Sequence, residues 1–60
     1  NTSYRGALEA GRAIEVMDIR DLEATLAQVS PADSDVIQVM QNLLRGSRNH
    51  LNAFERQLSR

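Results

Sequence analysis

The seven residues VSPADSD at positions 29–35 form the one clear break in a chain whose composition otherwise favours helix. Pro31 disfavours the helical conformation at Ser30, so a helix that arrives from the N-terminal side must end near this point. Ser30 or Asp33 can cap a second helix, and Asp33 and Asp35 suit the positive end of its dipole. A link this short makes the two helices antiparallel neighbours.

Before the break, residues 4–28 contain no proline and are rich in alanine and leucine, which predicts a helix over that range. Positions spaced seven apart, with companions three residues on, mark the side expected to face inward. That stripe comprises Leu8, Glu15, Leu22 and Val29, then Gly11, Asp18 and Thr25, with Ile19 and Leu26 beside them. Polar and small residues therefore interrupt an otherwise apolar surface.

After a turn at residues 29–33, a second helix is expected over residues 34–58. Its inward stripe is Ile37, Met40, Leu44, Ser47, Leu51, Phe54 and Leu58, and Val36, Leu43 and His50 lie along one edge of it. Gly46 falls in mid-helix, where glycine costs about 1 kcal/mol relative to alanine. This glycine suggests close approach of another backbone, or room for something in the core.

A chain of 60 residues is at the lower limit of what folds alone, because each helix of a single hairpin has one contact face and nothing covers the other. We therefore treat residues 1–60 as one helical hairpin that is completed by dimerisation or by the rest of a larger domain. The first residue, Asn1, is not methionine, and we expect the chain to have been processed, trimmed or excised.

Composition argues against several classes of function. The chain has no cysteine, which excludes disulfides and thiolate metal sites, and all seven of its basic residues are arginine, which excludes Schiff-base chemistry on lysine. A net charge of −1 and two aromatic residues give no reason to expect a nucleic-acid partner. No apolar run approaches the roughly 20 residues of a membrane span.

Ser47 and His50 share a helix face without an oxyanion donor, so we expect no catalytic residue.

Three polar groups fall within or beside the apolar stripes, namely Glu15, Asp18 and His50. Glu15 and His50 lie about 14 and 17 residues from the turn, or roughly 21 and 25 Å at 1.5 Å per residue, so they share one level. Asp18 is one turn nearer the loop on the face of Glu15. Its alternative role is a contact with Arg48, Asn49 or a backbone group of the neighbouring helix. We expect all three inside the bundle. Glu15 and His50 can form a buried polar pair there. Alternatively the groups form a metal site, since carboxylates and imidazole suit iron, manganese or zinc.

The segments GRAIEVMDIRDL (11–22) and LLRGSRNHLNAF (43–54) resemble a ferritin-like family known as domain of unknown function 2202, and the likeness extends over residues 6–58. The resemblance implies that this chain holds the third and fourth helices of a four-helix bundle around a carboxylate-rich centre. Glu15 then matches the third-helix glutamate and His50 the fourth-helix histidine. Ser47 stands three residues before His50, where the ferritin pattern has glutamate, so one bridging carboxylate is missing from this half.

Two functional hypotheses follow. The first is a ferritin-like, metal-binding oxidoreductase or iron-handling domain for iron or another divalent transition metal. Glu15 and His50 are its expected ligands, and Asp18 is a further ligand or a hydrogen-bond acceptor. Its partner is a second copy of the chain or the missing N-terminal helices. The second hypothesis is a metal-free assembly module in which the buried Glu–His pair fixes the register of the helices.

Overall fold

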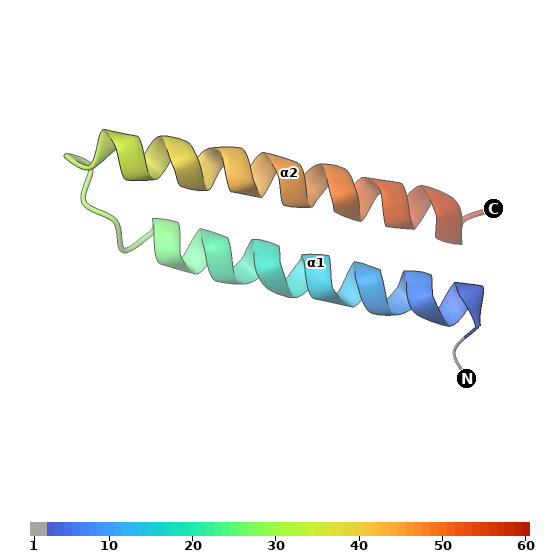
Figure 1. Cartoon of the computed structure of the whole chain (residues 1–60). Helices are drawn as coiled ribbons and strands as arrows, with labels where there is room; N and C mark the ends of the chain where they lie inside the picture. The colour runs from blue at the N-terminus through green and yellow to red at the C-terminus, as the bar shows by residue number, and fades with distance from the viewer. Residues whose placement is uncertain (1–2) are drawn as a thin grey trace.

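The computed structural model describes residues 3–60, which form an all-α antiparallel hairpin (Figure 1). The two helices are α1 (Tyr4–Leu26) and α2 (Ser34–Leu58), and they lie side by side along their whole length. The predicted hairpin is therefore confirmed, whereas a four-helix bundle needs a further pair of helices. Asn1, on which the expectation of processing rests, lies outside the described residues.

The first helix ends at Leu26, two residues before the expected position 28. Beyond Leu26 the backbone tightens: the Gln28 amide donates to the Thr25 carbonyl and the Val29 amide to the Leu26 carbonyl, at 3.0 and 3.1 Å. Such bonds over three residues are usual where an α-helix terminates. The chain thus leaves the helix just before the segment that Pro31 restricts.

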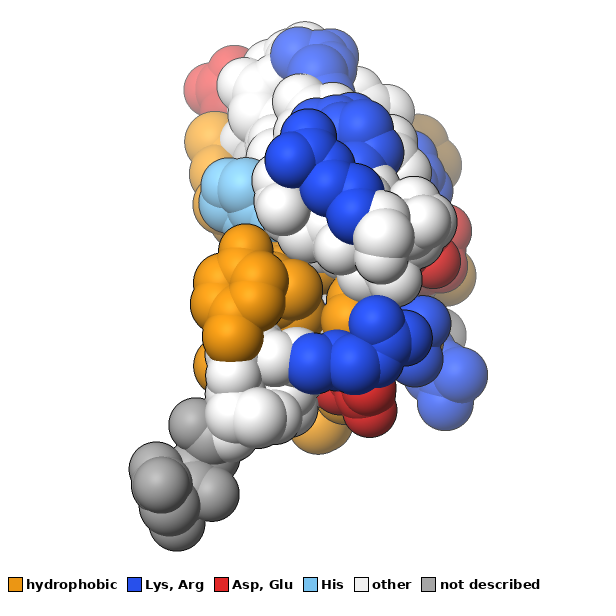
Figure 2. Space-filling model, turned by 90° about the vertical axis from the view of Figure 1, so that its right-hand side faces the viewer, with side chains coloured by type: hydrophobic (Ala, Val, Ile, Leu, Met, Phe, Trp, Pro, Cys, Tyr) orange, Lys and Arg blue, Asp and Glu red, His pale blue; other side chains and the backbone are white. Residues whose placement is uncertain are grey.

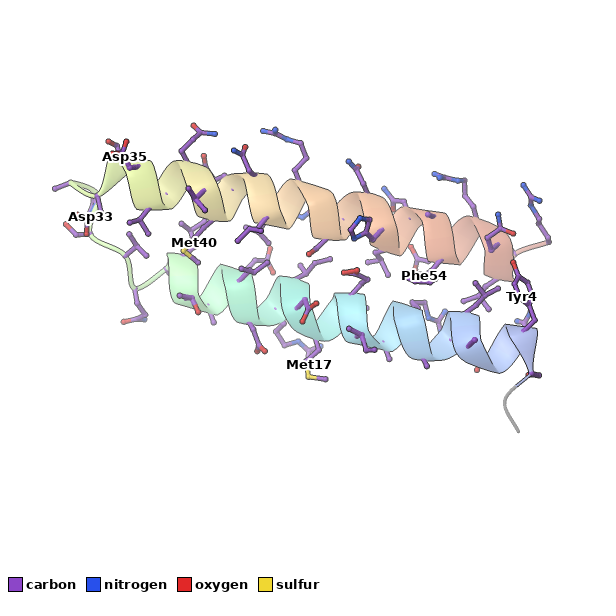
Figure 3. All side chains as sticks on the ribbon, viewed as in Figure 1. Tyr4, Met17, Asp33, Asp35, Met40 and Phe54 are labelled. Atoms are coloured by element: carbon purple, nitrogen blue, oxygen red, sulfur yellow. The ribbon has the colours of Figure 1, made fainter. Side chains whose placement is uncertain are left out.

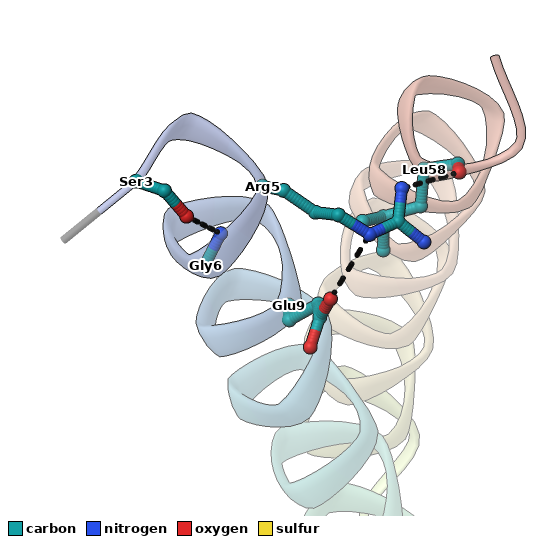
Figure 4. A network of polar contacts seen from close by, with 5 residues as sticks. All are labelled: Ser3, Arg5, Gly6, Glu9 and Leu58. Carbon is teal, nitrogen blue, oxygen red and sulfur yellow. Dashed lines mark hydrogen bonds and ion pairs between the residues drawn. The ribbon is translucent and has the colours of Figure 1, made fainter.

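The two helix starts differ in how they are capped. Ser3 Oγ accepts a hydrogen bond from the Gly6 amide at 2.9 Å and caps α1 (Figure 4). Asp33 occupies the cap position of α2, but its side chain makes no capping hydrogen bond. Ser30 Oγ instead accepts from the Ala32 amide within the turn, at 3.3 Å. The expected side-chain cap by Ser30 or Asp33 is therefore wrong, although the helix does begin directly after Asp33.

A second set of contacts in Figure 4 ties the free ends of the hairpin together. Arg5 Nη1 donates to the Leu58 carbonyl at 3.1 Å, and Arg5 Nε pairs with Glu9 at 3.3 Å. A guanidinium at the last turn of a helix also compensates the negative end of the helix dipole. These contacts hold the start of α1 against the end of α2.

The core is the strip between the two helices. The predicted stripe of α2 is confirmed, since Met40, Leu44 and Leu58 are buried and Ile37, Ser47, Leu51 and Phe54 are half-buried. Met40 and Phe54 lie between the helices in Figure 3. On α1 the half-buried positions are Gly6, Leu8, Gly11, Ile19, Leu22 and Leu26. This core is thin, because its most enclosed side chain, that of Leu44, still has 5% of its surface exposed.

Gly11 lies where α1 packs against the ring of Phe54. A Cβ atom at Gly11 would lie 2.5 Å from Phe54 Cζ, so only glycine leaves the ring where it is. Gly46 is different, because a Cβ atom there would meet nothing within 4 Å. The close approach that the sequence suggests at Gly46 is therefore not provided by this hairpin.

Candidate functional site

The candidate site is a contact between Glu15 of α1 and His50 of α2. Glu15 is the only buried charged residue of the described chain, with 9% of its surface exposed. His50 Nδ1 lies 3.3 Å from Glu15 Oε2, so the expectation that these two groups meet at one level is confirmed. The His50 side chain is 69% exposed, which shows that the pair opens onto solvent on the histidine side.

Helix periodicity explains why one member of the pair is buried and the other is not. Glu15 occupies a stripe position of α1 between Leu8 and Leu22, and that position faces α2. His50 lies at the edge of the α2 stripe, next to half-buried Leu51, and only its ring nitrogen reaches back to the carboxylate. His50 therefore lies at the rim of a single hairpin in contact with Glu15, and its expected place inside a bundle stays a prediction.

Asp18 is exposed in the single hairpin, and its expected place inside a bundle also stays a prediction. It lines an open groove between the helices together with Asp21, Leu22, Thr25, Met40, Leu43 and Ser47. Arg48, one of its alternative partners, pairs instead with Glu23, with Nη2 at 2.9 Å from Glu23 Oε2. Within residues 3–60, no three histidine or acidic side chains come together as they would around a metal ion. One hairpin therefore supplies two adjacent donor groups, Glu15 and His50.

The two long faces of the hairpin differ in chemistry. One face holds the groove that is lined by Asp18 and Leu43. Figure 2 shows the histidine of the chain among hydrophobic side chains on one side of the hairpin. The opposite face has a smaller hollow lined by Val16, Ile19, Arg20, Glu23 and Leu51, and the Arg48–Glu23 ion pair bridges the helices there. Neither α1 nor α2 combines the length and the hydropathy of a membrane-spanning helix.

Comparison with known proteins identifies the family. The chain matches the family described as "Uncharacterized protein domain (DUF2202)" over residues 1–60, and it belongs to that family, as the sequence predicted. It is also 43% identical over 53 residues to an uncharacterized protein of Methanocaldococcus jannaschii, a match that covers 88% of this chain. The chain spans only 28% of the length of that relative. No solved structure matches the chain.

Proposed function

We propose that this hairpin is one half of a ferritin-like four-helix bundle that binds iron or a similar transition metal through Glu15 and His50. The observation that carries this proposal is the buried Glu15 carboxylate in contact with His50 Nδ1, at 3.3 Å. Burying a carboxylate is costly unless it has a partner, and the exposed ring of His50 leaves that partner accessible from outside the hairpin.

The geometry of the pair gives each residue a role. With Nδ1 held at the Glu15 carboxylate, Nε2 is the ring nitrogen available to a ligand. Metal-binding histidines commonly have their second nitrogen oriented by a carboxylate in this way. Glu15 also has a second oxygen, so it can serve as a ligand itself or fix the orientation of the imidazole.

The donor set fits a metal when it is doubled. A single hairpin supplies one carboxylate and one imidazole, whereas bundle metal sites draw ligands from facing helices of both halves. Two such halves contribute two glutamates and two histidines, and exposed Asp18 on each half adds a carboxylate one turn away. A bound transition ion would supply oxygen or redox chemistry through its open coordination positions. The helices of both halves would supply the ligands, and the second half would cover the exposed side of His50.

A second candidate function is a metal-free assembly module, and one observation favours it. Among the described residues, no buried side-chain nitrogen or oxygen atom lacks a hydrogen-bond partner, so the hairpin holds no polar atom that requires a metal. A single polar pair in an apolar interface can fix the register of helices. The two functions therefore differ in whether the pair binds a metal.

We predict that protein purified without chelator and equilibrated anaerobically with ferrous iron retains the metal after desalting. Glu15→Gln and His50→Ala should each reduce retention at least tenfold, because each removes a donor group. Elemental analysis against protein concentration measures this. Glu23→Gln is the matched control, since it removes an exposed carboxylate on the opposite face and should retain iron. Equal retention in all four proteins, or none in any, would favour the assembly module.

A further inference from the structure

We propose that the face of the hairpin bearing Ile14, Val36, Val39 and Leu43 is the interface with a second copy of this chain. We call these four residues the apolar face. The inference rests on the proposed four-helix bundle and specifies the partner that completes it. In such a pair the two Glu15–His50 contacts lie between the hairpins, and each chain completes the donor set of the other.

Exposed hydrophobic side chains are concentrated on this side of the hairpin. Leu43 lines the groove, and Val36 and Val39 precede it by seven and four residues, which places them along the same side of α2. Ile14 precedes groove-lining Asp18 by four residues on α1. All four are exposed, as is Tyr4, whose hydroxyl bonds to Gln57 seven residues beyond His50.

The remaining surface does not share this character. Met17 points away from α2 in Figure 3, and Val16 is the one exposed large hydrophobic residue in the hollow on the opposite face. Around Val16 lie charged groups, among them Arg20 and the ion pair of Glu23 with Arg48. The hairpin thus has one face suited to water and one suited to a partner.

The exposed area is of the size that a partner would cover. The chain has 4565 Å² of accessible surface, about 650 Å² more than the roughly 3,900 Å² expected for a compact monomer of its mass. A standard protein interface buries about 800 Å² on each partner. With overall extents of 46 × 18 × 14 Å, the broad face has a footprint of roughly 830 Å², which is enough for such an interface.

Gly46 adds an independent observation. It lies three residues after Leu43 and four before His50, hence on the same side of α2, and it is the middle residue of that helix. Nothing in the hairpin approaches its missing side chain. A glycine at this point lets the backbone of another helix come close, and a second hairpin centred on Gly46 supplies that backbone.

The positions of the donor groups favour a symmetric pair. Glu15 is the middle residue of α1, and His50 lies one turn from the middle of α2. A two-fold axis through the middle of the apolar face therefore keeps both Glu15–His50 pairs at one level, whichever way the second hairpin is turned. The groove carries Asp18 and Asp21 and no arginine, so pairing also gathers negative charge that a bound cation would offset.

The test compares two substitutions of valine on opposite faces. In sedimentation equilibrium with chelator present, the unmodified chain should be a dimer at tens of micromolar. Val39→Asp should raise the dissociation constant at least 100-fold, because it places a charge in the interface, whereas Val16→Asp should leave it unchanged. A monomeric unmodified chain would overturn the inference, and so would equal effects of the two substitutions.

A cross-linking experiment keeps the inference testable if Val39→Asp fails to fold. The chain has no cysteine, so Gly46→Cys and Asn52→Cys each introduce a single thiol, the first on the apolar face and the second on the opposite side of α2. Mild oxidation should link most of the Gly46→Cys chains into dimers and few of the Asn52→Cys chains. Equal linking would contradict the interface. A dimer that binds no metal supports this inference and overturns only the metal proposal, whereas a monomer that binds metal overturns this inference alone.

Discussion

Leu44→Ala is expected to lower the free energy of unfolding by about 2–5 kcal/mol, because it removes the most enclosed side chain of a thin core. A chain of 60 residues has a total stability of only roughly 3–9 kcal/mol, so this loss leaves much of the protein unfolded at room temperature. Urea titration followed by circular dichroism at 222 nm measures the change.

The neighbouring residue provides the control for this prediction. Leu43 has the same side chain, but 53% of it is exposed in the hairpin. At dilutions where the chain is monomeric, Leu43→Ala should change the free energy of unfolding by less than about 0.5 kcal/mol. At concentrations where the apolar face is covered, Leu43→Ala should also become destabilising. Equal losses for the two substitutions in the monomer would show that the helices do not pack through the observed stripe.

Glu15→Leu is expected to raise the stability of the metal-free protein by about 1–4 kcal/mol. A leucine completes the apolar stripe of α1 between Leu8 and Leu22, and replacing a buried ionic group by a hydrophobic one is often stabilising. His50 is left without its partner but is largely exposed, so water solvates it. Urea titration in the presence of chelator measures this gain.

The same substitution should remove the response to metal. A ligand at 100 times its dissociation constant stabilises the folded state by about 2.7 kcal/mol, and this increment should appear in the unmodified protein and be absent in Glu15→Leu. Glu23→Leu, on the exposed opposite face, should change stability by no more than about 0.5 kcal/mol and keep the metal increment. A destabilised Glu15→Leu protein would mean that the Glu15–His50 contact is itself needed for the fold.

The sequence predicted the hairpin well because its main signals are local. Pro31 and the acidic residues after it located the turn, and apolar spacing identified the side of α2 that packs inward. The same reasoning placed Glu15 and His50 at one level, because rise per residue is nearly constant in α-helices. These features depend on neighbouring residues along the chain.

The sequence pattern did not distinguish positions that one neighbouring helix covers from positions that need a second neighbour. Asp18 was placed inside by a repeat of seven, but a straight helix of 3.6 residues per turn turns Asp18 about 60° away from Glu15. Such a position is covered only when a second neighbour packs there, and a two-helix hairpin has none. Exposure of Asp18 and His50 therefore has the same cause as exposure of Leu43: all three lie beside the strip that the partner helix covers.

The spacing of apolar residues also could not predict which individual side chains touch each other across the two helices. The close packing of Phe54 on Gly11 and the Arg48–Glu23 ion pair depend on how the two helices are set against each other. The position of Gly46 in mid-helix gave a usable signal, since it suggested the close approach of another backbone, which this hairpin does not provide. Gly46 therefore suggests a partner helix, and the same partner would supply the other half of the proposed metal site.

The most direct test of a metal site at the Glu15–His50 contact is the ¹⁵N NMR spectrum of the His50 imidazole during titration with zinc. The chain has one histidine, so the ring signals are unambiguous. We predict that one ring nitrogen shifts as a bound ligand, that the shift is complete at or below one zinc per chain, and that Glu15→Gln abolishes it. A folded protein whose histidine signals remain unchanged through several equivalents of zinc would contradict a metal site at the Glu15–His50 contact.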